Sequence, residues 1–194
     1  MNWFISGGCK NGKSHYAQNI AWEMAVKPSG AAVASGSAAE KPLYYLATMI
    51  PRDEEDEARI ARHIRERAGM GFETIERGLD IVGCLGGRTV SGKETDQSGV
   101  FLLDSVTALL SNEMFREDGT TDMDAPYRVA EELTDFARLT GNTVFVSDYI
   151  YSDAMIYDDL VEAYRRGLAL IDRTLAMACD HVAEVAYSFV KLHK

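Results

Sequence analysis

Residues 4–17 read FISGGCKNGKSHYA, an apolar run that gives way to glycines, a lysine and a serine. The spacing Gly7-x-x-x-x-Gly12-Lys13-Ser14 matches the phosphate-binding loop pattern. Glycines let the backbone turn its N–H groups toward phosphate oxygens, and a helix beginning near Lys13 would add the positive end of its dipole. Lys13 can neutralise the outer phosphates of a nucleotide, and the Ser14 hydroxyl suits Mg²⁺. The alternative is an ordinary glycine-rich turn between a strand and a helix, with an exposed lysine.

A second stretch nearly repeats this pattern and provides an internal comparison. Gly87-x-x-x-x-Gly92-Lys93-Glu94 keeps the glycines and the lysine but has a carboxylate where the hydroxyl should be. Glu94 would repel phosphate, and neither a clear strand nor an apolar helix flanks the stretch. We therefore interpret it as part of a surface loop.

The rest of the chain alternates between apolar runs and amphipathic segments. We expect strands at residues 3–6, 43–48, 72–76, 100–104, 143–148 and 182–190, and helices at 13–26, 53–67, 105–115, 124–139 and 158–178. Apolar strands alternating with helices indicate an α/β fold, P-loop NTPase-like, with a mostly parallel sheet and helices on both faces. We expect one nucleotide-binding domain over residues 1–194, with flexible loops at 27–42 and 83–99.

Charge and cysteine content argue against several classes of protein. The 194 residues carry a net charge of -10, which disfavours binding to nucleic acid because the overall field repels phosphate. Cys9, Cys84 and Cys179 are odd in number and lack metal-like spacing, which fits a reducing compartment. No segment has the pattern of a signal peptide or the length of a membrane span, so we expect a cytoplasmic protein.

Asp104 ends the apolar run VFLLD at residues 100–104. The carboxyl ends of parallel strands form the ligand-binding edge of such sheets. A carboxylate at that edge could hold Mg²⁺ or its waters together with Ser14. The alternative is that Asp104 simply caps the helix that follows.

A histidine lies on the charged segment DEEDEARIARHIRER at residues 53–67. On a helix, Asp56, His63 and Arg67 would share one face, with Arg59 close beside. Nearby cations favour the neutral imidazole, which is the nucleophilic form, and an arginine could hold a phosphate oxygen. The spacing by itself favours a partly exposed helix histidine with no chemical role.

Five segments, taken in order, resemble the bifunctional adenosylcobinamide kinase/adenosylcobinamide-phosphate guanylyltransferases, the CobU/CobP family. They are ISGGCKNGKSHYAQ, YYLAT, DEEDEARIARHIRER, VFLLDSVTALLSN and TVFVSD, and Arg59-Ile60-x-x-His63 is the most specific piece. The resemblance implies two reactions in adenosylcobalamin biosynthesis. A nucleoside triphosphate phosphorylates a hydroxyl on the aminopropanol arm of adenosylcobinamide, and GTP then donates GMP to that phosphate. It also implies a homotrimer.

The resemblance further implies a role for each matching residue. His63 would carry the guanylyl group as a covalent phosphoramidate, while Lys13 and Mg²⁺, the latter on Ser14 and Asp104, would stabilise the leaving charge. GTP or ATP would be the nucleotide substrate. The residues implied to contact it are Gly7, Gly8, Cys9, Lys10, Asn11, Gly12, Lys13, Ser14, Ala47, Thr48, Met49, Ile64, Arg65, Glu66, Arg67, Glu76 and Asp104.

The family pattern is not kept throughout the chain. After VFVS the family has Asn-Glu and then a Gly-Ile-Val-Pro segment, whereas this chain continues with Asp148 and Tyr149. We expect residues 148–173 to shape the cobinamide pocket or a subunit contact. Two alternatives therefore stay open: a P-loop kinase for another small molecule with His63 a bystander, and a non-catalytic GTP-binding homologue.

Overall fold

A single seven-stranded sheet organises the computed structural model of the chain, which describes residues 1–26, 41–116, 118–151 and 153–194. The strands are β1 (Trp3–Gly7), β2 (Leu43–Ala47), β3 (Glu73–Glu76), β4 (Val100–Asp104), β5 (Thr143–Asp148), β6 (His181–Ala186) and β7 (Phe189–Leu192). They lie in the order β3-β2-β4-β5-β1-β6-β7, and every neighbouring pair is parallel except β6 and β7. The predicted α/β fold with a mostly parallel sheet is confirmed.

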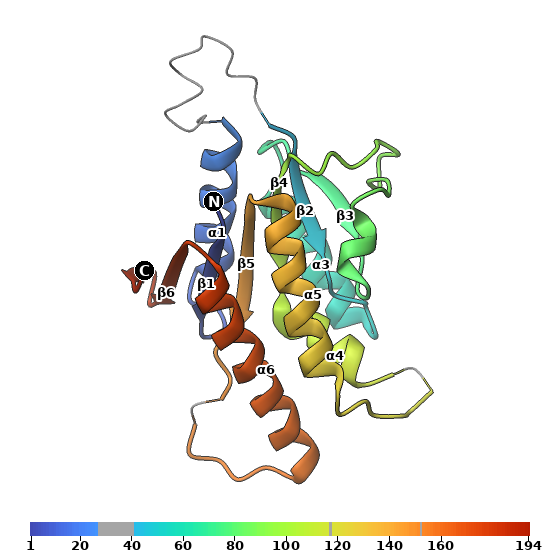
Figure 1. Cartoon of the computed structure of the whole chain (residues 1–194), viewed down its shortest axis with the longest axis vertical. Helices are drawn as coiled ribbons and strands as arrows, with labels where there is room; N and C mark the ends of the chain where they lie inside the picture. The colour runs from blue at the N-terminus through green and yellow to red at the C-terminus, as the bar shows by residue number, and fades with distance from the viewer. Residues whose placement is uncertain (27–40, 117, 152) are drawn as a thin grey trace.

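Helices cover both faces of this sheet (Figure 1). The helices are α1 (Lys13–Val26), α3 (Glu54–Glu66), the 3-10 helix η1 (Ile81–Cys84), α4 (Val106–Met114), α5 (Ala125–Thr140) and α6 (Asp159–Ala178), of which α3 has no buried residue. One face packs against small residues of α1 such as Ala17 and Ala21, which let the helix approach the strands closely. The other face carries Phe101 and Phe145 under α4, α5 and α6. Strands buried on both faces explain the continuous apolar runs in the sequence.

The strand order brings four strand ends together at one edge of the sheet. Gly7 at the end of β1 pairs with Asp148 at the end of β5. On the other side of β5, Asp104 of β4 pairs with Val146, and Ala47 of β2 pairs with Asp104. Segments far apart in the chain therefore meet at the carboxyl edge, where parallel sheets bind ligands.

Two expectations about local structure are corrected. Residues 182–190 do not form one strand, because Tyr187 and Ser188 have positive φ angles of 53° and 65° and turn the chain back as the hairpin β6–β7. The expected loop 83–99 begins within η1, where Cys84 is buried in the core. Of the expected loop 27–42, residues 27–40 lie outside the described residues.

Among the helices that the structure describes, none has the length and apolar character needed to cross a membrane.

Candidate nucleotide-binding site

The glycine loop of residues 7–14 joins β1 to α1, in the position that phosphate binding requires. Glycine is needed at two of its positions. A Cβ at Gly7 would lie 2.4 Å from the carbonyl oxygen of Val185, and Gly12 has a φ of +87°. The loop backbone therefore holds a shape that most side chains would not permit.

The turn of the C-terminal hairpin supports this loop from β6. The Ser188 N–H donates to the carbonyl oxygen of Asn11 at 3.1 Å, and the Tyr187 N–H donates to Asn11 Oδ1 at 3.4 Å. Sequence reasoning missed this contact because it treated residues 182–190 as one strand. The unusual pair of positive φ angles at Tyr187 and Ser188 has no clear signal in those residue types.

Lys13 is buried at the start of α1, so the alternative of an exposed lysine is wrong. Its Nζ lies 2.6 Å from Asp148 Oδ1 and donates to the Gly8 carbonyl oxygen at 3.3 Å. The ammonium is thus directed over the loop rather than into solvent. Asp148 was noticed in the sequence only as a departure from a family pattern, because its closeness to Lys13 depends on β5 lying beside β1.

Asp104 faces the same edge and is held by a hydrogen bond from β2. The Tyr45 hydroxyl donates to Asp104 Oδ2 at 3.0 Å. Burial raises the pKa of the Asp104 carboxyl, and the nearby charge of His63 and the Tyr45 hydrogen bond partly oppose that rise. Asp104 is not the cap of α4, since the Ser105 side chain accepts the capping hydrogen bond from the Ala108 N–H at 3.2 Å.

The oxygen donors at this edge fit a magnesium ion that is held largely by phosphate and water. The Ser14 hydroxyl lies at the start of α1 and the Asp104 carboxylate at the end of β4. Across the described ranges of the chain, no group of three or more His, Cys, Asp or Glu side chains could hold a metal ion alone. Ser14 and Asp104 could therefore hold Mg²⁺ together with phosphate oxygens and water.

His63 lies on α3, on the same side of the sheet edge as Asp104. Asp53 caps the helix by accepting a hydrogen bond from the Asp56 N–H at 2.9 Å. The imidazole is close enough to Asp104 to lower the pKa of that carboxyl, and its Nδ1 is buried without a hydrogen-bond partner. Glu66 Oε2 lies 3.4 Å from Nδ1.

The expected cationic surroundings of His63 are only partly present. Arg59 pairs with Asp56 at 3.6 Å, and Arg62 pairs with Glu66 at 3.7 Å, so acidic neighbours offset both arginines. Arg67 is buried at the end of α3 and does not reach outward for a phosphate. The helix therefore presents a partly exposed imidazole among paired charges.

The structure places the other implied nucleotide contacts in three different settings. Ala47 lies at the strand edge beside Asp104, and Glu76 lies opposite Ala47 at the end of β3. By contrast, Thr48 is fully buried and its hydroxyl bonds to the Ser105 backbone. Ile64, Arg65 and Glu66 are exposed on the last turn of α3.

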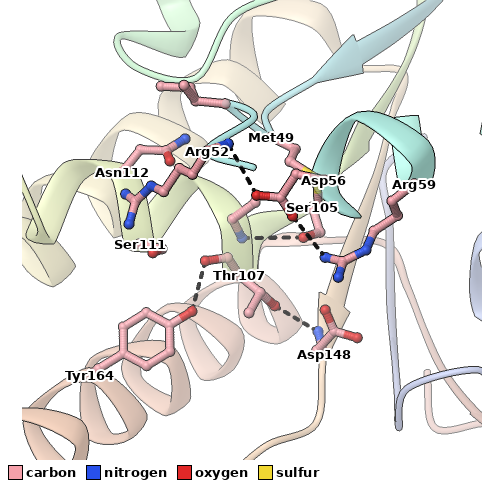
Figure 2. A pocket seen from close by; sticks show the side chains of 12 residues that line it. Met49, Arg52, Asp56, Arg59, Ser105, Thr107, Ser111, Asn112, Asp148 and Tyr164 are labelled. Atoms are coloured by element: carbon pink, nitrogen blue, oxygen red, sulfur yellow. Dashed lines mark hydrogen bonds and ion pairs between the residues drawn. The ribbon is translucent and has the colours of Figure 1, made fainter. Parts of the chain in front are cut away.

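A cavity of about 310 Å³ opens next to the ion pair of Lys13 and Asp148. Arg52, Asp56 and Arg59 line one wall, and Thr107, Asp148 and Tyr164 line the facing wall (Figure 2). The remaining lining residues are Met49, Ile50, Ser105, Ala108, Ser111 and Asn112. The cavity combines two guanidinium groups, two carboxylates and several hydroxyls, which suits a polar ligand that can both donate and accept hydrogen bonds.

Comparison with known proteins identifies one family. Residues 3–189 match the family model described as CobU: Cobinamide kinase / cobinamide phosphate guanyltransferase. No curated protein matches the chain. A solved structure from Pyrococcus horikoshii OT3, described as a structural study, aligns with a TM-score of 0.48 and 8% identity, covering 100% of this chain and 85% of that one.

Proposed function

The chain belongs to the CobU family of cobinamide kinases and cobinamide phosphate guanyltransferases, and from that premise we propose that one site at the sheet edge performs both reactions. The observation that carries this proposal is that Asp104 ends a strand at this edge and that Lys13 and His63 both lie near enough to lower the pKa of its carboxyl. A phosphate-binding lysine and a carboxylate suit any P-loop kinase. The imidazole beside them is the additional group that a covalent nucleotidyl transfer needs.

In the first reaction, the glycine loop would bind the triphosphate tail of GTP or ATP. Backbone N–H groups of residues 7–14 and the start of α1 favour the negative charge, and Lys13 lies close enough to the loop to contact the outer phosphates. Magnesium, held by Ser14 and Asp104, would neutralise developing charge on the phosphates. The γ-phosphoryl group would pass to a hydroxyl of the acceptor.

In the second reaction, His63 would act as the nucleophile. An imidazole nitrogen bonds to the α-phosphorus of GTP, and the bond from that phosphorus to the departing pyrophosphate breaks. The phosphate of the acceptor then attacks the phosphoramidate and releases His63. Lys13 would stabilise the charge on pyrophosphate as it leaves. The route through His63 divides the GMP transfer into two steps: the imidazole attacks GTP, and the acceptor phosphate then attacks the phosphoramidate.

We assign the cavity of about 310 Å³ to the arm of the acceptor. Its volume admits a short polar arm and a phosphate but excludes a corrin macrocycle, which would stay at the mouth. Asp148 and Tyr164 both line it, and both come from the segment 148–173 that departs from the family pattern. That departure also leaves room for a kinase acting on a different small alcohol, which an acceptor panel would reveal.

The covalent step gives the most direct test. We expect GTP labelled on the α-phosphate to leave an acid-labile label on the protein, and expect that label to be lost in His63→Ala. His193→Ala is the matched control, because His193 is exposed and pairs with Glu184 away from the site. Label that persists in His63→Ala, or wild-type protein that takes up none, would contradict the guanylyltransferase mechanism.

Homotrimer assembly is a separate part of the proposal. It derives from family resemblance, and light scattering of the purified chain tests it. A monomer that still performs both reactions would show that the site is complete within one chain.

A further inference from the structure

Asp148 is the one carboxylate of the described site that both contacts the phosphate-loop lysine and lines the cavity assigned to the acceptor. We propose that Asp148 accepts the proton of the acceptor hydroxyl during phosphoryl transfer, and that nucleotide binding releases it from Lys13 to do so. The assignment rests on the proposed function. It concerns only the kinase half of that function.

Strand pairing and a hydrogen bond hold the backbone of Asp148 in place, while its carboxylate is able to change partners. Asp148 ends β5 beside Gly7, and its N–H donates to Thr107 Oγ1 at 2.9 Å. The Tyr164 hydroxyl donates to the Thr107 carbonyl oxygen at 2.8 Å, which ties α6 to the same point (Figure 2). The carboxylate, with 27% of its side chain exposed, therefore sits at a defined place between loop and cavity.

Without nucleotide, Lys13 and Asp148 satisfy each other at 2.6 Å. The outer phosphates of a bound triphosphate carry more negative charge than one carboxylate, so they compete for the ammonium. Once Lys13 turns to them, Asp148 loses its cationic partner and becomes an available proton acceptor facing the cavity. A hydroxyl placed in the cavity would then lie between this acceptor and the γ-phosphate.

The transfer exchanges one bond at the γ-phosphorus for another. The hydroxyl oxygen bonds to the γ-phosphorus, and the bond from that phosphorus to the β,γ-bridging oxygen breaks, with its electron pair leaving on the nucleoside diphosphate. The hydroxyl proton moves to a carboxylate oxygen of Asp148 and from there to solvent. No further reactant is needed.

The guanylyl transfer does not require a proton acceptor. The attacking group there is a phosphate oxygen that is already ionised near neutral pH, so no proton has to be removed. A residue that was needed to hold Lys13 on the bound nucleotide would behave differently. Because Lys13 is proposed to act on the nucleotide in both halves, losing such a residue would slow both.

The test measures the two halves separately in the full chain. Asp148→Asn keeps the shape of the side chain but removes the proton acceptor. We expect its kcat for phosphorylation of adenosylcobinamide to fall about 100-fold or more. At saturating GTP, where Lys13 is proposed to contact the phosphates in both proteins, enzyme guanylylation and GMP transfer to acceptor that is already phosphorylated should stay within about twofold, a change too small to reflect a lost proton acceptor. GTP should bind as tightly or more tightly, because it no longer competes with a carboxylate for Lys13.

Asp159→Asn, an exposed carboxylate at the start of α6, is the matched control and should change neither half. Asp148→Glu should recover part of the kinase rate if it folds. Thermal unfolding of each variant checks that the variant is folded. Equal loss of both halves in Asp148→Asn, or an unchanged kinase rate, would overturn the assignment while leaving the proposed function intact. Wild-type protein that lacks both halves would overturn the proposed function and the assignment with it.

Discussion

The guanidinium group of Arg67 lies over the ring of Tyr45, with 3.9 Å between its central carbon and the ring centroid. Arg67 is the residue that ends α3, and Tyr45 is the β2 residue whose hydroxyl holds Asp104. Burial raises the pKa of Tyr45 well above its usual range, so its hydroxyl stays protonated and remains a donor to Asp104. This contact links the helix that carries His63 to the strand that positions the carboxylate.

Removing the Arg67 side chain should weaken both the fold and the transfer step. Arg67→Ala loses the stacking on Tyr45 and the hydrogen bond to Thr74 Oγ1 at 3.1 Å, which together are worth about 2 kcal/mol. We expect that loss in urea unfolding and a slower guanylylation of the protein by GTP. Arg62→Ala, at an exposed position of the same helix, should show neither effect. A stable Arg67→Ala protein with lost GTP binding would instead indicate direct contact with the nucleotide.

Thr48 offers a second test of whether a residue supports the fold or contacts the nucleotide directly. Its hydroxyl accepts a hydrogen bond from the Ser105 N–H at 2.7 Å and donates to the Ser105 carbonyl oxygen at 2.8 Å. Thr48→Val keeps the shape but leaves the Ser105 N–H without its partner, while the Ser105 carbonyl still accepts from the Leu109 N–H, so the free energy of unfolding should drop by about 1–3 kcal/mol.

Since Thr48 is fully buried, the affinity for GTP should change little in the same variant. Equilibrium binding of GTP to wild-type protein and Thr48→Val measures this directly. A loss of about tenfold, equal to about 1.4 kcal/mol, would show that the nucleotide reaches Thr48.

The elements of the fold could be predicted because each carries a local signal. The loop at residues 7–14 needs glycine at special backbone positions, and buried parallel strands such as Val100–Asp104 are apolar throughout. Ser105 followed by an apolar run marks a helix start, although the sequence left the choice between Ser105 and Asp104 open.

The site could be predicted only as separate pieces. Which residues meet depends on strand order, and no local pattern specifies that β5 lies beside β1 or that Tyr45 faces Asp104. The pairing of Lys13 with Asp148 was missed for this reason. Helical spacing put Arg67 on the face of His63, whereas Arg67 caps the end of α3 and its buried guanidinium lies over Tyr45, a contact that helical spacing does not reveal.

The close approach of the phosphate loop to β6 should make Gly7 intolerant of any side chain. In Gly7→Ala the new Cβ would lie 2.4 Å from a backbone oxygen of Val185, so the two strands must separate. We expect a loss of several kcal/mol in urea unfolding, typical of forced backbone displacement in a core, and loss of GTP binding. Gly86→Ala is the matched control: its Cβ would meet no atom within 4 Å, so the change should be neutral or stabilise by about 0.4–1 kcal/mol. Equal stability of the two variants would contradict the described packing of β1 against β6.

Asp172 should make the stability of the protein depend on pH. It is buried on α6, where the Tyr151 hydroxyl donates to its Oδ2 at 3.0 Å and its Oδ1 has no hydrogen-bond partner. Burial raises the pKa of this carboxyl to about 7, and hydrogen bonding only partly opposes that rise. Between the ordinary carboxyl pKa near 4 and a value of about 7, the folded protein therefore holds a proton that the unfolded chain has released.

It follows that Asp172 lowers stability as pH rises across that window, with a slope of up to about 1.4 kcal/mol per pH unit, and has no further effect above it. Urea unfolding at pH values from 4 to 8 measures this slope together with the contributions of the other titrating groups. Asp172→Asn keeps the shape without the titration, so it should flatten the profile and be the more stable protein at pH 8. Asp159→Asn, an exposed carboxylate on the same helix, should leave the profile as in wild type. If Asp172→Asn instead destabilises the protein most at pH 8, the carboxylate is ionised in the folded state and its charge is compensated within the core.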